Sequence, residues 1–389
     1  MAKFSIRTYN KISQIGLNEF EAGTYSIGED QSDPDAIILR SYSLHDEPIP
    51  ESVSAIGRAG AGVNNIPVDK MSERGVVVFN APGANANAVR EVVLAGMLIA
   101  ARNIDGAMEY VKDLSGEDIK TQVEAGKKKY AGVELRGKTV SVIGLGAIGL
   151  RVANSAVDLG MKVKGFDPSL SVSNALQLDS SVEQVNTLEE ALSGADYVTI
   201  HVPLIDPTRG MIDSSKIGLL KPTSVLINFS RDEIVDEPSI VKALAEDKLG
   251  KYVTDFPNQT TIGKKGVIAL PHLGASTAEA EDNCAVMIAH QLKDYLENGN
   301  IRNSVNLPNV VLSRKSSTRL CLVHLNKPGI VADISKVLAK HKFNIAEMIN
   351  KSRADLAYTV IDLDKSLDEN TEKSLKKLDD LISFRVIAG

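Results

Sequence analysis

Short apolar runs alternate with longer stretches of mixed polarity along most of the chain. Such runs, rich in β-branched residues, predict buried strands. They lie at 4–8, 36–39, 54–56 and 76–79, and again at 139–143, 162–166, 198–201, 224–228, 252–254 and 267–269. Strands that alternate with helical stretches form parallel sheets covered on both faces. The pattern therefore predicts an α/β fold with two sets of parallel strands.

Two apolar-rich helical stretches, 88–101 and 278–297, border the second set of strands. Each is long enough to cross between two domains. The second set is therefore predicted to form a domain, 96–284, inserted into a first domain made of 1–95 and 285–308. Such an insertion leaves a cleft between the two domains, where ligands commonly bind.

A further compact module is predicted after the break at 306–309 and the polar stretch 313–318. Strand patterns lie at 319–325, 343–348, 357–362 and 384–387, and helical patterns run from Pro328 to His341 and over 370–381. This order, βαββαβ, is that of a ferredoxin-like fold. The module spans 316–389, and nothing in it points to catalysis.

Composition narrows the class of protein. A chain of 389 residues with 43% hydrophobic and 24% charged residues is typical of a soluble protein with two or three domains. The net charge of −6 argues against a nucleic-acid binder, and we expect the densest basic run, three lysines at 127–129, to be a solvated loop. Cys284 and Cys321 lie far apart and indicate neither a disulfide framework nor a metal site. With no signal-peptide core and no apolar run near about 18 residues, the chain is expected to be cytoplasmic and not bound to a membrane.

A glycine motif follows the strand 139–143. Gly144, Gly146 and Gly149 form G-x-G-x-x-G at a turn into a helix, and Asp167 ends the next strand. The first glycine permits the turn, the second lets a pyrophosphate approach the backbone, and the third packs the helix on the strand. A lone match is often an ordinary glycine turn, but here all the parts come in order. The motif predicts a dinucleotide site, and Asp167 favours NAD over NADP because a carboxylate repels a 2′-phosphate.

Three polar segments follow later strands of the same set. His201 ends one strand, Arg231 follows the next, and His272 follows the last. The carboxyl ends of parallel strands form the ligand crevice of such sheets. An arginine can hold a carboxylate through two hydrogen bonds, and a histidine can take a hydroxyl proton as hydride leaves the same carbon. Either residue alone would more often be a surface arginine or a loop histidine, but together at one sheet edge they favour a catalytic role.

These motifs resemble those of a known family, the D-isomer-specific 2-hydroxyacid dehydrogenases. The matching segments are 57–63, 80–85, 144–149, 201–203, 228–231 and 271–277, in the family's order. The final module resembles an ACT domain, a regulatory fold that binds small effectors. The resemblance implies two doubly wound parallel-sheet domains, a Rossmann nucleotide domain inserted in a flavodoxin-like substrate domain, followed by a ferredoxin-like ACT domain. NAD is the implied cofactor.

The resemblance also implies roles for single residues. Arg231 would bind the substrate carboxylate and His272 would be the acid/base, while Arg58 is a candidate for the substrate phosphate. The implied substrate contacts are Arg58, Gly83, Ala84, Asn85 and Arg231. The implied cofactor contacts are Gly144, Gly146, Ala147, Ile148, Gly149, Asp167, His201, Val202, Pro203, Thr208, Phe229, Ser230, Asp255, His272 and Gly274.

One position departs from the family's pattern. The family pairs its histidine with a glutamate, and here Gln259 stands where that glutamate is expected. No acidic residue lies between Phe256 and Pro271. A glutamine can orient an imidazole, but it cannot neutralise an imidazolium. Asp255 corresponds to the family's cofactor-amide aspartate in one alignment, and Thr254 takes that place in another.

The ACT resemblance narrows the implied function. The residues His324, Asn326 and Asn344 match the pattern with which serine-inhibited family members hold L-serine. An imidazole and two amides suit this ligand because they offer hydrogen-bond donors and acceptors to a zwitterion. The implied reaction is the NAD-dependent oxidation of 3-phospho-D-glycerate to 3-phosphohydroxypyruvate, the first step of L-serine biosynthesis. A glyoxylate or hydroxypyruvate reductase and a non-catalytic NAD-binding sensor are the alternatives. Family members pair through their nucleotide domains and often through ACT modules, which implies a homo-oligomer, a dimer or a tetramer.

Overall fold

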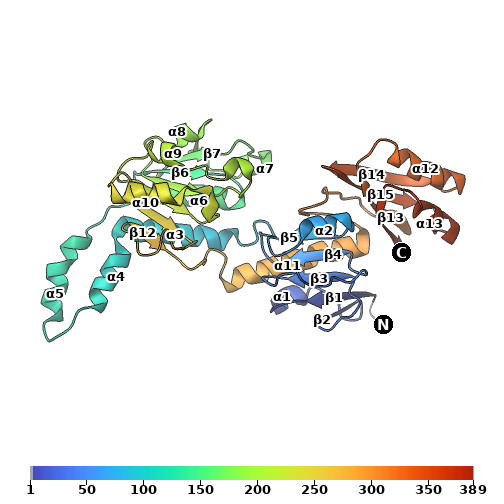
Figure 1. Ribbon diagram of the computed structural model, residues 1–389, viewed down its shortest axis with the longest axis horizontal. Helices are drawn as coiled ribbons and strands as arrows, with labels where there is room; N and C mark the ends of the chain where they lie inside the picture. The colour runs from blue at the N-terminus through green and yellow to red at the C-terminus, as the bar shows by residue number, and fades with distance from the viewer. Residues whose placement is uncertain (1–2, 389) are drawn as a thin grey trace. The chain divides into compact units, whose positions relative to one another are not determined.

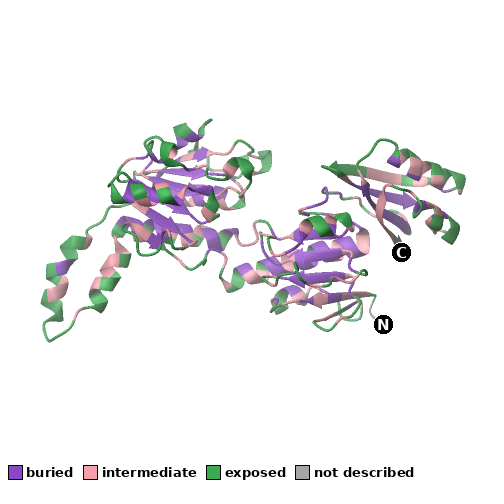
Figure 2. Ribbon diagram, in the orientation of Figure 1, coloured by how far each residue is buried: buried purple, intermediate pink, exposed green. Residues whose placement is uncertain are grey.

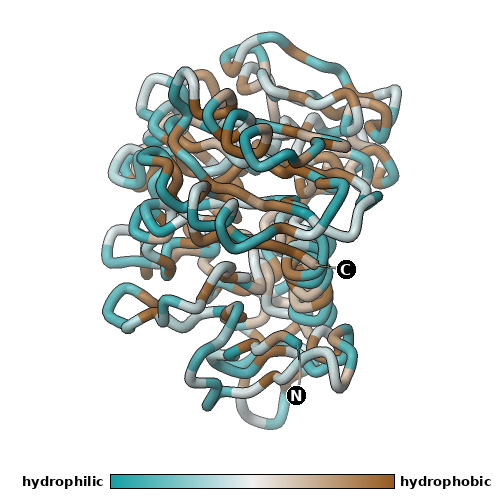
Figure 3. Tube along the Cα trace, turned by 90° about the vertical axis from the view of Figure 1, so that its right-hand side faces the viewer, coloured by the Kyte–Doolittle hydropathy of each residue, from teal (hydrophilic) through white to brown (hydrophobic). Residues whose placement is uncertain are grey.

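The computed structural model describes residues 3–388, which form three sheets (Figure 1). The chain divides into two compact units. One unit runs to Asn85 and resumes at Ala278, and the other is Ala86–Thr277. The sequence predicts domain boundaries near 95 and 284, and the boundaries between the two compact units fall several residues earlier in both places. Figure 3 shows the hydrophobic positions as short brown runs between teal segments, the alternation from which the strands are predicted.

The first sheet is entirely parallel and has the order β2-β1-β3-β4-β5, which confirms the flavodoxin-like topology. Its strands are β1 (Phe4–Thr8), β2 (Tyr25–Gly28), β3 (Ala36–Leu39), β4 (Ala55–Arg58) and β5 (Val77–Asn80), with the helices α1 (Gln14–Leu17) and α2 (Val68–Glu73). The sequence pattern misses β2. This strand lies at the edge of the sheet and has only one buried residue, Tyr25, so it lacks the apolar run of the central strands.

The long helix α11 (Ala278–Asn298) closes one face of this sheet. Its buried side includes Ile288 and Leu292, which lie against β4. A Cβ built on Gly57 of β4 would come within 2.4 Å of Ile288 Cγ2, so the glycine allows the helix to lie directly on the strand. The first domain is therefore completed by residues far downstream in the chain.

The second sheet is also parallel and has the order β12-β11-β10-β9-β6-β7-β8. The sheet reverses its order beside β6, as in a Rossmann fold, which confirms that expectation. Its strands are β6 (Thr139–Ile143), β7 (Lys162–Phe166), β8 (Glu183–Gln184), β9 (Tyr197–Ile200), β10 (Val225–Asn228), β11 (Lys251–Thr254) and β12 (Val267–Ala269). The apolar residues of α3 (Ala86–Arg102) and α6 (Ala147–Asp158) form one core with the strands. Those of α8 (Leu188–Leu192), α9 (Ser214–Ile217) and α10 (Glu237–Ala245) form another. The remaining short helices are α7 (Val172–Ala175), η2 (Asp206–Thr208) and η3 (Asp232–Ile234).

A helical hairpin extends from this second unit. It comprises α4 (Ile104–Lys112), α5 (Ile119–Gly126) and the single 3₁₀ turn η1 (Lys127–Tyr130). Figure 2 shows it almost wholly in green and pink, and α4 has no buried residue. The lysines at 127–129 are exposed, as expected, but they lie in η1 rather than in a loop.

The C-terminal module has the expected βαββαβ order and an antiparallel sheet, β14-β15-β13-β16. Its elements are β13 (Thr318–Leu325), α12 (Ile330–Lys340), β14 (Ile345–Arg353), β15 (Leu356–Leu363), α13 (Glu369–Leu375) and β16 (Leu381–Ala388). Both helices cover the same face of the sheet (Figure 1). The helix α13 ends at Leu375, before the expected end at 381, and β16, which pairs with β13, already starts at Leu381.

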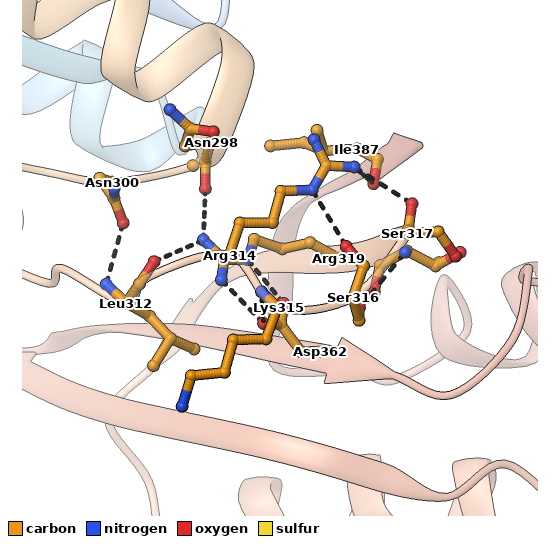
Figure 4. A network of polar contacts seen from close by, with 12 residues as sticks. Asn298, Asn300, Leu312, Arg314, Lys315, Ser316, Ser317, Arg319, Asp362 and Ile387 are labelled. Atoms are coloured by element: carbon orange, nitrogen blue, oxygen red, sulfur yellow. Dashed lines mark hydrogen bonds and ion pairs between the residues drawn. The ribbon is translucent and has the colours of Figure 1, made fainter. Parts of the chain in front are cut away.

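The other face of this small sheet lies on the first domain. Cys321 and Tyr358 share a hydrophobic core with Tyr295 of α11, and Tyr358 Oη donates a hydrogen bond to the Gly299 carbonyl at 2.7 Å. Arg319 of β13 donates to the carbonyls of Asn298 and Leu312 at 2.8 Å each (Figure 4). The module is thus joined to the first domain by apolar packing as well as by the chain.

None of the helices in residues 3–388 has both the length and the apolar character that a membrane span requires.

Candidate active site

The glycine-rich turn lies between β6 and α6. Gly144 has φ 91°, and a Cβ on it would come within 2.6 Å of the His201 carbonyl oxygen. A Cβ on Gly149 would come within 1.8 Å of the Gly144 carbonyl oxygen, so the helix lies on the turn only because this residue is a glycine. Gly146, at the N-cap of α6, has open space at its Cβ position. The first N–H groups of a helix have no intrahelical acceptor, so this turn offers donors and room to a phosphate.

Asp167 follows β7 and lies beside that turn. Its Oδ2 accepts a hydrogen bond from the Leu145 backbone N–H at 2.8 Å, and its Oδ1 accepts from the Ser169 N–H at 2.8 Å. Each carboxylate oxygen can accept a second hydrogen bond. The carboxylate is therefore fixed in place and still able to accept a ribose hydroxyl.

His201 follows β9, next to the glycine turn. Its Nε2 lies 2.9 Å from Thr199 Oγ1, and its Nδ1 is buried with no hydrogen-bond partner in the described chain. Burial lowers the pKa of His201 to about 3, so the imidazole is neutral at physiological pH. In the loop that follows, Thr208 Oγ1 donates to the Pro203 carbonyl at 2.6 Å. This loop therefore has a defined shape and offers an unpaired ring nitrogen.

Arg231 follows β10 in a turn that Asn228 shapes. The buried Asn228 side chain donates to the Arg231 carbonyl at 2.7 Å and accepts from the Ser230 N–H at 3.1 Å. Ser230 Oγ donates to the Ile200 carbonyl at 2.7 Å, which ties the turn to β9. The guanidinium of Arg231 is exposed, and within residues 3–388 no acidic side chain pairs with it. It is therefore available to a carboxylate.

His272 follows β12 in a loop bound to Asp255. Asp255 is 1% exposed, and its two oxygens accept from the Leu273 and Gly274 N–H groups at 2.7 Å each. Burial raises the pKa of Asp255, and the two backbone N–H groups oppose that shift. The His272 ring is exposed and meets the Phe256 ring edge-on, at 5.0 Å between centroids.

Gln259 lies in the loop that follows β11, and its side chain is exposed. No hydrogen bond joins it to His272 in the described part of the chain. The neighbouring residue, Asn258, donates to Glu237 Oε2 at 2.6 Å. Sequence reasoning missed Glu237, a buried carboxyl at the start of α10 whose pKa is raised by burial. Its position directly before Pro238, in the first turn of a helix, is the signal that could have drawn attention to it.

The expected substrate contacts of the other unit are held near β4 and β5. Arg58 Nε donates to the Arg40 carbonyl at 2.9 Å. Gly83 has φ 78°, and the side-chain oxygen of Asn85 is buried without a hydrogen-bond partner among the described residues. An unpaired buried amide oxygen is a group that a ligand can satisfy.

The expected effector residues do not come together within one chain. His324 is buried, with Nδ1 2.8 Å from the Leu325 carbonyl and Nε2 2.8 Å from Thr359 Oγ1. The strands β13 and β14 both pair antiparallel with β15 and so run in the same direction. Asn326 follows the end of β13 and Asn344 precedes the start of β14, so they lie at opposite ends of the sheet, roughly 25 Å apart at about 3.3 Å per residue.

Two family models match the chain. The model described as "D-isomer specific 2-hydroxyacid dehydrogenase, NAD binding domain" matches residues 94–274. The model described as "AHAS small subunit-like ACT domain" matches residues 320–384. The two matches cover the second unit's sheet and the C-terminal module.

Curated relatives cover most of the chain. The D-3-phosphoglycerate dehydrogenase of Escherichia coli K12 is 32% identical over 351 residues, which are 87% of this chain and 82% of the relative. The protein of that name from a Synechocystis species is 38% identical over 283 residues, 70% of this chain and 49% of the relative.

Solved structures agree with the fold. The NAD⁺-bound 3-phosphoglycerate dehydrogenase of Entamoeba histolytica matches with a TM-score of 0.62 and 26% identity, covering 78% of this chain and 99% of that one. The holo form of D-mandelate dehydrogenase from Rhodotorula graminis matches with a TM-score of 0.68 and 21% identity, over 80% of this chain and all of that one (100%), which supports the fold alone.

Proposed function

We propose that the chain oxidises 3-phospho-D-glycerate to 3-phosphohydroxypyruvate. The premise is that it belongs to the D-isomer-specific 2-hydroxyacid dehydrogenase family and is an NAD-dependent oxidoreductase. The observation that carries the proposal is that two exposed side chains, Arg231 and His272, lie three residues after the ends of β10 and β12 of the NAD-binding sheet. They offer an imidazole and an exposed guanidinium, which donates from Nη1 to the Ser230 carbonyl and has no acidic partner among the described residues, at the edge where such sheets bind ligands. The name shared by the curated relatives supports the choice of substrate.

The glycine turn and the loops beside it fit NAD. Gly146 leaves open space at the N-terminus of α6, Asp167 has acceptor capacity to spare, and His201 has an unpaired ring nitrogen. When bound there, NAD⁺ supplies the hydride acceptor. The residues that would hold it are Gly144, Gly146, Ala147, Ile148, Gly149, Asp167, His201, Val202, Pro203, Thr208, Phe229, Ser230, Asp255, His272 and Gly274.

Two side chains of this unit act on the substrate. Arg231 holds the carboxylate by two parallel hydrogen bonds, which fixes the hydroxyl-bearing carbon. An imidazole nitrogen of His272 takes the hydroxyl proton while the C–H bond electrons leave that carbon as hydride, so the alcohol becomes a ketone. We also propose Gly83, Ala84 and Asn85 as substrate contacts and Arg58 as the residue for the substrate phosphate.

The ACT domain would bind L-serine as an inhibitor. His324, Asn326 and Asn344 can contact one serine only if two copies of the chain contribute, because Asn326 and Asn344 lie at opposite ends of one sheet. Antiparallel association along the edge strand β14 would bring the start of β14 in one copy to the end of β14 in the other, where Asn326 lies. We therefore propose a homo-oligomer, a dimer or a tetramer, whose serine sites lie between copies.

The test is NADH formation from NAD⁺ across a panel of 2-hydroxy acids. We expect 3-phospho-D-glycerate to give the highest kcat/KM, and His272→Ala to lose most of that activity. A preference for glycolate or glycerate would assign the chain to the glyoxylate or hydroxypyruvate reductases instead. NADH binding without turnover of any substrate would favour a sensor.

A further inference from the structure

We infer that Asp255 is a positioning residue for His272, because it fixes the loop that carries the imidazole through backbone hydrogen bonds. This inference rests on the proposed role of His272 as the acid/base. The family's glutamate is missing, and Gln259 makes no hydrogen bond with His272 in the described chain. The inference explains how the imidazole is held in place without them.

The backbone of His272 is in a conformation that needs support. Its φ of 55° lies in the left-handed region, which residues other than glycine adopt at a cost in free energy. Three hydrogen bonds to Asp255 hold the segment there. The His272 N–H donates to the Asp255 carbonyl at 3.1 Å, and the next two N–H groups donate to the carboxylate. Without them, the loop would relax to conformations that point the imidazole elsewhere.

The site is built for a carboxylate rather than for any polar group. The Leu273 and Gly274 N–H groups converge on separate oxygens of Asp255, the arrangement of a backbone anion site. A Cβ on Gly274 would come within 3.1 Å of Asp255 Oδ2, so the glycine permits the close approach. Because Asp255 is buried, water does not compete for these bonds, which strengthens them.

The residue after Asp255 acts on the ring itself. Phe256 meets the His272 imidazole edge-on at 69°, and the Phe256 N–H donates to Thr254 Oγ1 at 3.1 Å. Neighbouring residues of one strand end therefore fix both the backbone and the ring of His272. Neither contact needs a charge on the side chain at position 259.

The test is Asp255→Asn, which keeps the size of the side chain and one acceptor oxygen but turns an NH₂ group towards the second N–H. We expect kcat for phosphoglycerate oxidation to fall roughly 10–10²-fold, the effect of a small misplacement of a reacting group. Because Asp255 is also a proposed NAD contact, the Kd of NADH is measured by fluorescence beside kcat, so that an effect on cofactor binding is separated from an effect on His272. A loss of NADH affinity with kcat unchanged would overturn the inference and leave Asp255 as a cofactor contact alone. The matched control is Asp213→Asn, where the carboxylate caps α9 by accepting the Lys216 N–H.

A double-mutant cycle separates this inference from the proposed function. If Asp255 acts through His272, Asp255→Asn should slow the wild-type enzyme but not the His272→Ala enzyme. Equal slowing of both would overturn the inference. Wild-type turnover by His272→Ala alone would instead overturn the proposed function. Hydrogen exchange of a peptide covering 270–277 checks the structural cause. Its amides should exchange faster in Asp255→Asn, while the rest of the chain keeps its protection. Unchanged exchange in this peptide would also contradict the inference.

Discussion

The guanidinium of Arg319 and the carboxylate of Asp362 form a bidentate ion pair in which both side chains are fully buried (Figure 4). Nε lies 2.6 Å from Oδ1 and Nη2 lies 2.8 Å from Oδ2. Because the third nitrogen, Nη1, donates to the carbonyls of Asn298 and Leu312, the same side chain fastens the ACT sheet to the end of α11.

Removing one member of this pair should destabilise the chain strongly. Arg319→Met leaves a buried carboxylate without its counter-ion, and we expect a loss of about 3–5 kcal/mol in the free energy of unfolding. Urea unfolding followed by circular dichroism measures it. The double variant Arg319→Met with Asp362→Leu should recover part of the loss, because no charge is then left buried alone. A double variant less stable than either single one would contradict this account.

The cofactor preference should depend on Asp167. We expect Asp167→Ala to lower the ratio of kcat/KM for NAD to that for NADP on the order of tenfold or more, because a nearby carboxylate repels a 2′-phosphate and accepts a ribose hydroxyl. Asp167→Asn serves as the control, since it removes the charge but can still accept the Leu145 N–H. An unchanged ratio in both variants would show that Asp167 does not determine the preference for NAD over NADP.

Arg231 should act on substrate binding. With phosphoglycerate as the substrate, Arg231→Ala is expected to raise KM roughly 10–150-fold, the effect of losing charged hydrogen bonds worth about 1.5–3 kcal/mol. The KM of Arg231→Lys should lie between those of the wild type and Arg231→Ala, because lysine keeps the positive charge but lacks the planar guanidinium. The Kd of NADH should not change. Arg209→Ala is a control of similar exposure, since Arg209 pairs with Glu233 on the surface; an equal rise in KM there would argue against a specific clamp.

His201 should make the folded chain sensitive to acid. Its pKa is about 3 when folded and 6.5 when unfolded, so between these values the unfolded state binds the extra proton. Stability from this group is complete above pH 6.5 and falls as the pH drops, by up to about 1.4 kcal/mol per pH unit. We expect the Tm of His201→Gln to decrease less between pH 7 and pH 5 than the Tm of the wild type does. His45→Gln, at an exposed histidine, should behave like the wild type.

Serine inhibition should need both Asn326 and Asn344. Each alanine variant is expected to need roughly tenfold or more serine for half-inhibition of its own uninhibited rate, since an amide contact is lost. A mixture of the two variants, unfolded and reassembled together, should regain a sensitive fraction, because pairs of unlike chains keep one intact site. Asn370→Ala, at an exposed amide, is the control. A mixture no more sensitive than its parts would contradict a site between copies.

The sequence predicts the strands that carry an apolar run, including edge strands such as β5 and β12, and it misses two edge strands that lack such a run. The missed strands β2 and β8 lie at the ends of their sheets, and both residues of β8, Glu183 and Gln184, are exposed. Arg231 and His272 could be predicted because each lies within three residues of the end of a strand. The bonds of Asp255 could not, because they depend on the pairing of β11 with β12 and on a left-handed backbone at His272. The separation of Asn326 from Asn344 follows from strand order, which a motif does not contain.

The closing of the first sheet by α11 has a consequence for synthesis of the chain. The strands β1–β5 are made first, but the helix that covers them is made only after the whole unit Ala86–Thr277. That unit is continuous and can fold as it leaves the ribosome, whereas the N-terminal strands must keep apolar residues such as Ile6 and Ile38 exposed until α11 follows. We therefore expect the second domain to fold before the first, and the nascent N-terminal segment to be the part of the chain that chaperones bind.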